Sequence, residues 1–163
     1  MTKIFIAISS ILLCIIIFPI SASALPDLVV AGIAAGAPSF INPSEANLPL
    51  TVTIRNNGDP TGERFKLSVD VIDSSGRFVK SFTVPGSEDI WYPWRRGLAR
   101  GEGYSFRGVL HIGIPRGPSL RGQRITIIPH VDSCSGDEFM AGYCRVQESN
   151  EANNELQRSI NLP

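Results

Sequence analysis

The chain has 163 residues, of which 43% are hydrophobic and 18% are charged, and its formal net charge is zero. Nucleic-acid-binding proteins normally carry a basic excess, so this balance argues against that class. The length beyond residue 24 is that of one domain with its own hydrophobic core. We therefore expect a single domain over residues 25–163.

The N-terminus has the pattern of a secretory signal peptide. Lys3 supplies a positive charge, residues 4–18 are almost wholly apolar, and Ala22-Ser23-Ala24 is a small-x-small site for signal peptidase. We predict cleavage after Ala24, which removes residues 1–24 and leaves a secreted or periplasmic protein that meets the membrane only through this peptide. A retained anchor is the alternative, but about 15 apolar residues fall short of the roughly 20 that a span needs.

Strand patterns begin soon after the predicted cleavage site. Residues 27–33 are apolar at both odd and even positions, whereas residues 50–55 alternate apolar with polar, as a half-buried strand does. Residues 65–71 have the cleanest alternation in the chain. Residues 73–76, Asp-Ser-Ser-Gly, predict a turn, and residues 77–84 are expected to be the hairpin partner of the preceding strand.

Three further strands are expected in the second half of the chain, over residues 104–112, 125–131 and 156–162. Pro129 indicates an edge strand or a bulge, because proline cannot donate to a ladder. Seven or eight short strands with turns between them and no convincing helix predict an all-β fold. The expected architecture is an antiparallel β-sandwich of immunoglobulin type, with a barrel as the second choice.

Two cysteines remain after the predicted cleavage, Cys134 and Cys144, since Cys14 lies in the signal peptide. An even pair in an exported chain predicts a disulfide bond. Closing so short a loop would contribute roughly 2–3 kcal/mol on the chain-entropy model. A catalytic or metal-binding pair is the alternative, but the CxxC spacing and a neighbouring histidine are both missing.

Catalytic motifs are not found in this sequence. The nucleophile elbow, the P-loop, the dinucleotide fingerprint and the HExxH zinc motif are all missing. The two histidines, His111 and His130, have the parity of residues that point away from the core. We therefore expect surface histidines and no enzyme. A small secreted hydrolase with a carboxylate pair 5–9 Å apart remains an unfavoured alternative.

One segment without strand periodicity combines aromatic and basic residues, which dominate interaction hot spots. Flat aromatic rings also stack on sugars, so a carbohydrate-binding module is an alternative. The competing interpretation is that the tryptophans fold back to cap the end of the sandwich. The candidate ligand-binding residues are Trp91, Tyr92, Trp94, Arg95 and Arg96.

A second polar segment, residues 148–155, is rich in carboxylate and amide oxygens, which are the ligands of calcium. EF-hand spacing is missing, however, and asparagines also stabilise ordinary turns through bonds to the backbone. We favour the turn and expect no cofactor, with calcium as the minority hypothesis. The candidate calcium ligands are Asp132, Glu148, Asn150, Glu151 and Asn153.

Four pieces of the chain together resemble CARDB domains, the cell adhesion related domain found in bacteria. Residues 26–30, PDLVV, look like the opening of that family, and residues 50–58 like its strand ending in an N-x-G turn. Residues 98–102 are similar to its L-x-x-G-[ED] segment. Asp132 followed by residues 148–154 is similar to its D…E-x-N-E-x-N-N ending, which is the most specific of the four.

This resemblance implies a seven-stranded immunoglobulin-like sandwich that acts as an extracellular, non-catalytic module, and it names no ligand. The chain departs from the family in its long interval between Asp132 and Glu148, which holds the cysteines, and in the aromatic segment around Trp91. We therefore expect an exported binding or adhesion module whose partner is a protein or glycan at or outside the cell envelope. Residues 91–96 are the first expected contact, and the loop 134–144 is the second.

Overall fold

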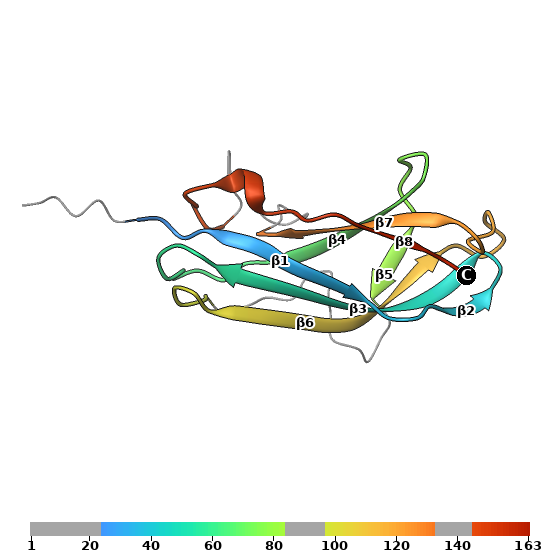
Figure 1. Ribbon diagram of the computed structural model, residues 1–163, viewed down its shortest axis with the longest axis horizontal. Coiled ribbons are helices and arrows are strands. Elements are labelled where there is room, and N and C mark those ends of the chain that lie inside the picture. The colour runs from blue at the N-terminus through green and yellow to red at the C-terminus, as the bar shows by residue number, and fades with distance from the viewer. Residues whose placement is uncertain (1–23, 84–96, 133–144) are drawn as a thin grey trace, which may run out of the picture.

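The computed structural model describes residues 24–83, 97–132 and 145–163, and within them the regular secondary structure is almost entirely β-strand (Figure 1). This confirms the all-β prediction. One short 3-10 helix, η1, was not expected from the sequence. The elements are β1 (Leu28–Ala35), β2 (Ser39–Asn42), β3 (Glu45–Asn56), β4 (Leu67–Asp73), β5 (Ser81–Thr83), β6 (Gly103–Gly113), β7 (Arg124–Val131), η1 (Glu151–Asn153) and β8 (Arg158–Asn161).

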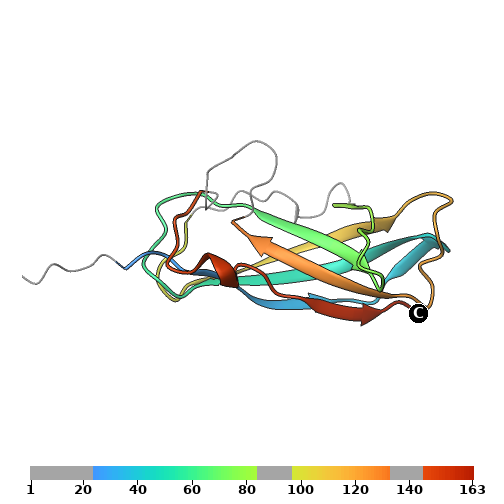
Figure 2. The same cartoon turned by 90° about the horizontal axis from the view of Figure 1, so that it is seen from above.

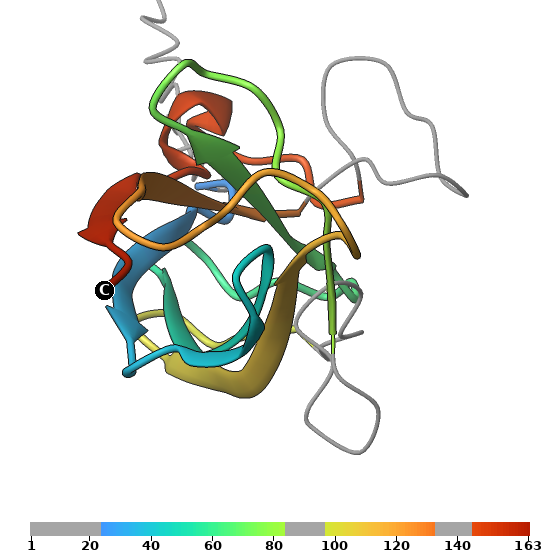
Figure 3. The same ribbon diagram turned by 90° about the vertical axis from the view of Figure 1, so that its right-hand side faces the viewer.

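The strands form two antiparallel sheets that pack face to face, as Figure 3 shows from the end that bears the C-terminus. The larger sheet has the order β1-β3-β6-β5, with β2 added against β3, and the smaller sheet has the order β4-β7-β8. The predicted β-sandwich of immunoglobulin-like, all-β character is therefore confirmed.

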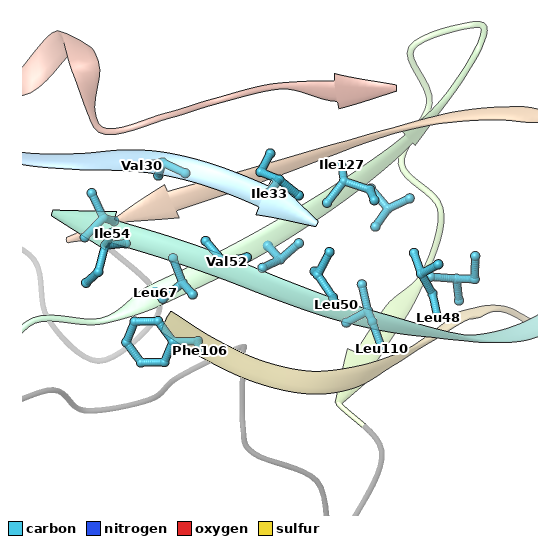
Figure 4. Packing of buried hydrophobic residues seen from close by; sticks show 14 of the residues in the cluster. Val30, Ile33, Leu48, Leu50, Val52, Ile54, Leu67, Phe106, Leu110 and Ile127 are labelled. Atoms are coloured by element: carbon cyan, nitrogen blue, oxygen red, sulfur yellow. The ribbon is translucent and has the colours of Figure 1, made fainter. Parts of the chain in front are cut away.

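The hydrophobic core lies between the sheets, where alternate residues of each strand point inward. Leu50, Val52 and Ile54 of β3 are at most 2% exposed, as the alternation over residues 50–55 predicts. They meet side chains of the smaller sheet such as Leu67 and Ile127 (Figure 4). The core thus fixes which face of each strand is left for the surface.

A β-bulge explains why the first strand is apolar at both parities. The register of β1 against β3 shifts between Val30 and Gly32. Val30 and Ile33, three positions apart, are consequently both buried. An extra residue in one strand reverses the alternation beyond it, so a single period cannot describe such a strand.

The expected hairpin over residues 77–84 forms only in its first half. Arg77 and Val79 exchange backbone hydrogen bonds with Asp73 and Val71 of β4. The chain then crosses to the other sheet, where β5 pairs with β6. The prediction was wrong there because a local pattern shows that a strand forms but not which sheet it joins.

Pro129 lies on the central strand of the smaller sheet, so its expected place on an edge strand was wrong. β7 pairs with β8 as far as Ile127 and Arg158, and a bridge between His130 and Glu155 continues the same register. The gap between them coincides with Pro129, which has no N–H to donate toward this side. The missing donor therefore interrupts the β7–β8 ladder at Pro129, and the two segments stay side by side beyond it.

Candidate functional site

A pocket of about 250 Å³ opens between three loops. These loops lie at the end of the sandwich that carries the C-terminus (Figure 1). We call this pocket the end pocket. It lies between three connections, namely the β2–β3 turn, the β4–β5 loop and the β6–β7 loop. The residues that matter for its chemistry are Ser44, Phe78, Lys80, Ile114, Leu120 and Gln123.

The β4–β5 loop is shaped by Asp73, whose carboxylate caps the turn that follows β4. Its Oδ1 accepts hydrogen bonds from the Ser75 N–H at 2.8 Å, the Ser75 hydroxyl at 2.5 Å and the Arg77 N–H at 3.1 Å. These bonds, that from the Ser75 hydroxyl above all, hold the pKa of Asp73 well below its usual range. Gly76, at φ 82°, completes the reversal and leads into Phe78 at the pocket.

The β6–β7 loop is attached to the β2–β3 turn by hydrogen bonds to one carbonyl. The Leu120 N–H donates to the Pro43 oxygen at 2.7 Å, and the Ser119 hydroxyl donates to the same oxygen at 3.3 Å. Gly113, the last residue of β6, has a φ of 92°, and a Cβ added to it would lie 2.0 Å from the Ser44 carbonyl oxygen. The β2–β3 turn and the β6–β7 loop, which line the end pocket, are thus joined through a backbone carbonyl and not through side chains alone.

Two large apolar side chains at the end pocket are unusually exposed. Phe78 is 75% exposed and Ile114 is 42% exposed. A single exposed apolar residue needs no explanation, but two that border one concavity are typical of a surface that binds something. A shallower hollow of about 360 Å³ lies over β1, β3 and β6, and neither of these residues lines it.

The opposite end of the sandwich holds the residues that the sequence offered as calcium ligands. They belong to a hydrogen-bonded region that we call the C-terminal clasp, in which they bond to one another or to neighbouring residues. From it, η1 and β8 continue along the side occupied by β1 (Figure 2). The clasp residues are Asp132, Glu148, Asn150, Glu151, Asn153 and Asn154.

Glu148 is the centre of the clasp and is only 6% exposed. One carboxyl oxygen accepts a hydrogen bond from the N–H of Leu28, the first residue of β1. The other oxygen accepts from the Asn154 amide at 3.0 Å. Further along β1, Arg158 donates to the Ile33 carbonyl. The C-terminal segment therefore covers polar groups on the outer edge of β1, which an open edge strand would present for pairing with another chain.

Burial raises the pKa of Glu148 to about 8, and the nearby carboxylates of Glu151 and Asp132 add to the rise. The hydrogen bonds from Leu28 and Asn154 act in the opposite direction, because they favour the carboxylate. Burial prevails over them, so Glu148 is mostly a neutral acid at pH 7.

Most of the other clasp oxygens also have partners within the chain, whereas the Oδ1 atoms of Asn153 and Asn154 are buried without a hydrogen-bond partner among the described residues. Asp132, at φ 52°, accepts from the N–H groups of Arg145 at 3.1 Å and Val146 at 2.8 Å. Glu151 accepts from the Glu148 N–H at 2.9 Å, and the Asn150 side chain caps η1. Within residues 24–83, 97–132 and 145–163, no group of three or more His, Cys, Asp or Glu side chains could hold a metal ion.

We expect the clasp to be independent of calcium, because each of its carboxylates already accepts hydrogen bonds from the protein. The melting temperature should be the same in excess EDTA and in millimolar CaCl₂, as measured by differential scanning calorimetry. Mg²⁺ serves as the control for an unspecific effect of divalent ions. A rise of several degrees with Ca²⁺ alone would support the calcium hypothesis instead, because a ligand that binds only the folded state stabilises it.

Other predicted site residues lie outside the described part of the chain. These are the aromatic and basic segment with Trp91, Tyr92, Trp94, Arg95 and Arg96, and the cysteine pair Cys134 and Cys144. Both assignments stay predictions. The end pocket itself was missed by the sequence reasoning, in which the Asp73–Gly76 turn was the one local signal near it.

The histidines both lie on outer faces of the sandwich, as their parity predicts, but they belong to different sheets and cannot meet. His111 of β6 is nevertheless buried, with Nε2 3.2 Å from Glu45 and Nδ1 3.1 Å from Asn47. His130 of β7 lies between Asp70 and Glu155, at 3.3 Å from each. The expectation of a surface histidine was therefore wrong for His111, whose polar neighbours enclose it.

The fold and the end pocket define a β-sandwich with a concave, partly apolar surface at one end. Comparisons with models of protein families, with curated proteins and with solved structures each return no match. In the described part of the chain there is no helix with the length and hydropathy needed to cross a membrane.

Proposed function

We propose that this chain is an exported, non-catalytic binding module of the adhesion type, which engages a protein or glycan at or outside the cell envelope. The observation that carries the proposal is the end pocket, where Phe78 and Ile114 stay exposed beside a concavity. Exposing apolar area at a pocket has a cost in water that contact with a partner removes.

The kinship with CARDB domains is part of the same proposal. Its most specific element, the ending that begins at Glu148, supports it because every Glu and Asn of that motif has a hydrogen-bonding role in the clasp. A hydrogen-bonded motif that joins the segment before the last strand to the first strand would stabilise any sandwich of this kind. This structural role would explain the motif in CARDB domains without a ligand.

The two carboxylates of the clasp that lie closest together support binding rather than hydrolysis. Glu148 and Glu151 are neighbours, but Glu148 is buried and both accept hydrogen bonds that hold the clasp together. A glycoside hydrolase needs its two carboxyl groups facing a cleft that admits a sugar. A carbohydrate-binding role remains the second candidate, through the aromatic segment 91–96.

A pull-down from envelope material tests the proposal. Wild type, Phe78→Ala/Ile114→Ser and Trp91→Ala/Trp94→Ala are compared, and Leu156→Ala serves as a control because Leu156 is exposed away from the end pocket. We expect a partner that wild type and the control capture and that at least one double variant loses. The same captured set for all four proteins, with every variant folded, would contradict binding through these surfaces. A glycan array on the same proteins separates sugar from protein ligands.

A further inference from the structure

The end pocket is smaller than the pockets that enclose drug-sized ligands, and its size suits one side chain of a protein. Pockets that enclose drug-sized molecules or cofactors have about 300–1,000 Å³. The end pocket has about 250 Å³ and is lined in part by Phe78, Ile114 and Leu120. An apolar side chain that enters such a concavity is the usual anchor of a protein interface. The size therefore favours a protruding residue of a partner.

Charge around the end pocket is positive although the chain as a whole is neutral. Residues 73–80 and 114–124 contain five Lys or Arg residues and one Asp. That carboxylate, Asp73, is bound by the Arg77 guanidinium at 2.9 Å. Lys80 lines the end pocket, and Arg121 lies over the ring of Phe40 at 4.2 Å with its side chain exposed. The exposed charge that a partner meets here is therefore cationic.

The main chain at Phe78 offers a further contact. Arg77 and Val79 direct their backbone groups toward β4, where the Val79 N–H donates to Val71 at 2.7 Å. Phe78 lies between them, so its own N–H and C=O point the other way, as alternate residues of a strand do. Within the described residues, no backbone hydrogen bond to Phe78 is formed. An extended segment could pair with this residue in the manner of an added strand.

These three observations point to one kind of occupant. We propose that the end pocket binds an extended, acidic protein segment, which places an apolar side chain between Phe78 and Ile114 and its carboxylates near Lys80 and the arginines of the β6–β7 loop. The inference rests on the proposed binding function and narrows it to a class of partner. A membrane surface fits less well, because the outward-facing N–H and C=O of Phe78 match the backbone of an extended peptide, which lipid lacks.

The test uses the full mature chain and three labelled peptides of eight residues, followed by fluorescence anisotropy. The first peptide has a central Phe flanked by Asp and Gly, the second has Lys in place of each Asp, and the third has Ala in place of Phe. We expect only the first to bind, and the dissociation constant should rise steeply with salt because screening weakens the charge contacts.

Protein variants locate the binding. Phe78→Ala and Lys80→Glu should each raise the dissociation constant by about tenfold or more, the effect expected of a hot-spot residue. Arg64→Glu is the matched control, since it makes the same charge change on an exposed residue before β4, at the far end of that strand. It should change the constant less than about twofold. Circular dichroism confirms that each variant is folded.

The outcomes separate this inference from the proposed function. Equal binding of the acidic and basic peptides, or a Lys80→Glu variant that binds like wild type, would overturn the inference. So would sedimentation with phosphatidylglycerol vesicles that Phe78→Ala abolishes while no peptide binds, because the surface would then recognise lipid. If the peptides fail but envelope material still yields a partner, the binding function stands without this site. If both fail, the proposed function fails as well.

Discussion

Replacing Glu148 by Ala is expected to lower the free energy of unfolding by about 2–4 kcal/mol, because buried donors lose their partners. The Leu28 N–H and the Asn154 amide both donate to this side chain, which is 6% exposed. Chemical denaturation at pH 7 measures the effect. Glu148→Gln is the matched variant, since it keeps the shape and the neutral charge of the buried acid. It should cost less than half as much.

The same residue makes stability depend on pH. Burial raises the pKa of Glu148 from 4.5 to about 8, so the folded state binds a proton that the unfolded state releases. The resulting stabilisation is complete below about pH 4.5 and is lost as the pH rises through about 8. Between about pH 6 and pH 9 wild type should lose roughly 1–3 kcal/mol through this group.

Denaturation of wild type and Glu148→Gln over this range checks the pH dependence. The difference between the two proteins should change with pH in the direction just given, since the amide does not titrate. Parallel pH profiles for the two would show that Glu148 is not the group responsible. An alanine variant as stable as wild type would show that the clasp contributes little to holding β1.

Substituting Ala for Gly113 is expected to destabilise the fold by more than about 3 kcal/mol, the range of severe backbone and packing defects. Gly113 has a φ of 92°, which L side chains rarely adopt, and an added Cβ would lie 2.0 Å from the Ser44 carbonyl oxygen. Relief requires the β2–β3 turn to move, and that turn carries the carbonyl that holds the β6–β7 loop. The end pocket should therefore be disturbed together with stability.

Gly122→Ala separates the cost of the backbone conformation from the cost of the close contact with Ser44. Gly122 has a φ of 72° in the same loop, but an added Cβ there would meet nothing within 4 Å. This substitution should lower the free energy of unfolding only by the cost of the left-handed conformation, roughly 1–2 kcal/mol. Thermal unfolding of both variants gives the comparison. Equal losses would mean that the contact with Ser44 is relieved without difficulty, and that backbone conformation alone decides the cost.

Alternation along the chain predicted the strands whose two faces differ in environment. β3 and β4 are examples, since one parity of each faces the core. The short β2 was missed because four residues hold too few repeats of a period of two. β1 did not alternate because its bulge reverses the faces near Val30. Local pattern is informative only where register is unbroken.

Alternation along the chain could not show which sheet a strand joins. The segment after Gly76 begins as a partner of β4 and then leaves for β6. Pro129 does interrupt the hydrogen-bond ladder, as expected of a proline, but it lies on a central strand and not on an edge strand. In both cases the deciding partners are distant in sequence, so no local signal reports them.

The candidate sites likewise depend on contacts between residues that are distant in the sequence. Residues 148–154 were identified as a polar turn, but their roles depend on Leu28 and Asp27, which lie more than 100 positions away in the chain. The end pocket draws its walls from three connections, none of which has a binding motif of its own. Phe78 follows an ordinary turn, and nothing in its sequence neighbourhood indicates that it is exposed beside a hollow.

Alternation and turn chemistry predicted an all-β fold, with a sandwich favoured over a barrel, because both signals are local and act within a few residues. The tertiary structure alone decided that Glu148 is a buried acid beneath the edge of β1 and that cationic loops surround a hollow with exposed Phe78. The physical reason is that burial and electrostatic environment arise from groups that only folding brings together. Amino-acid type sets what a side chain can do, and its neighbours in space set what it does.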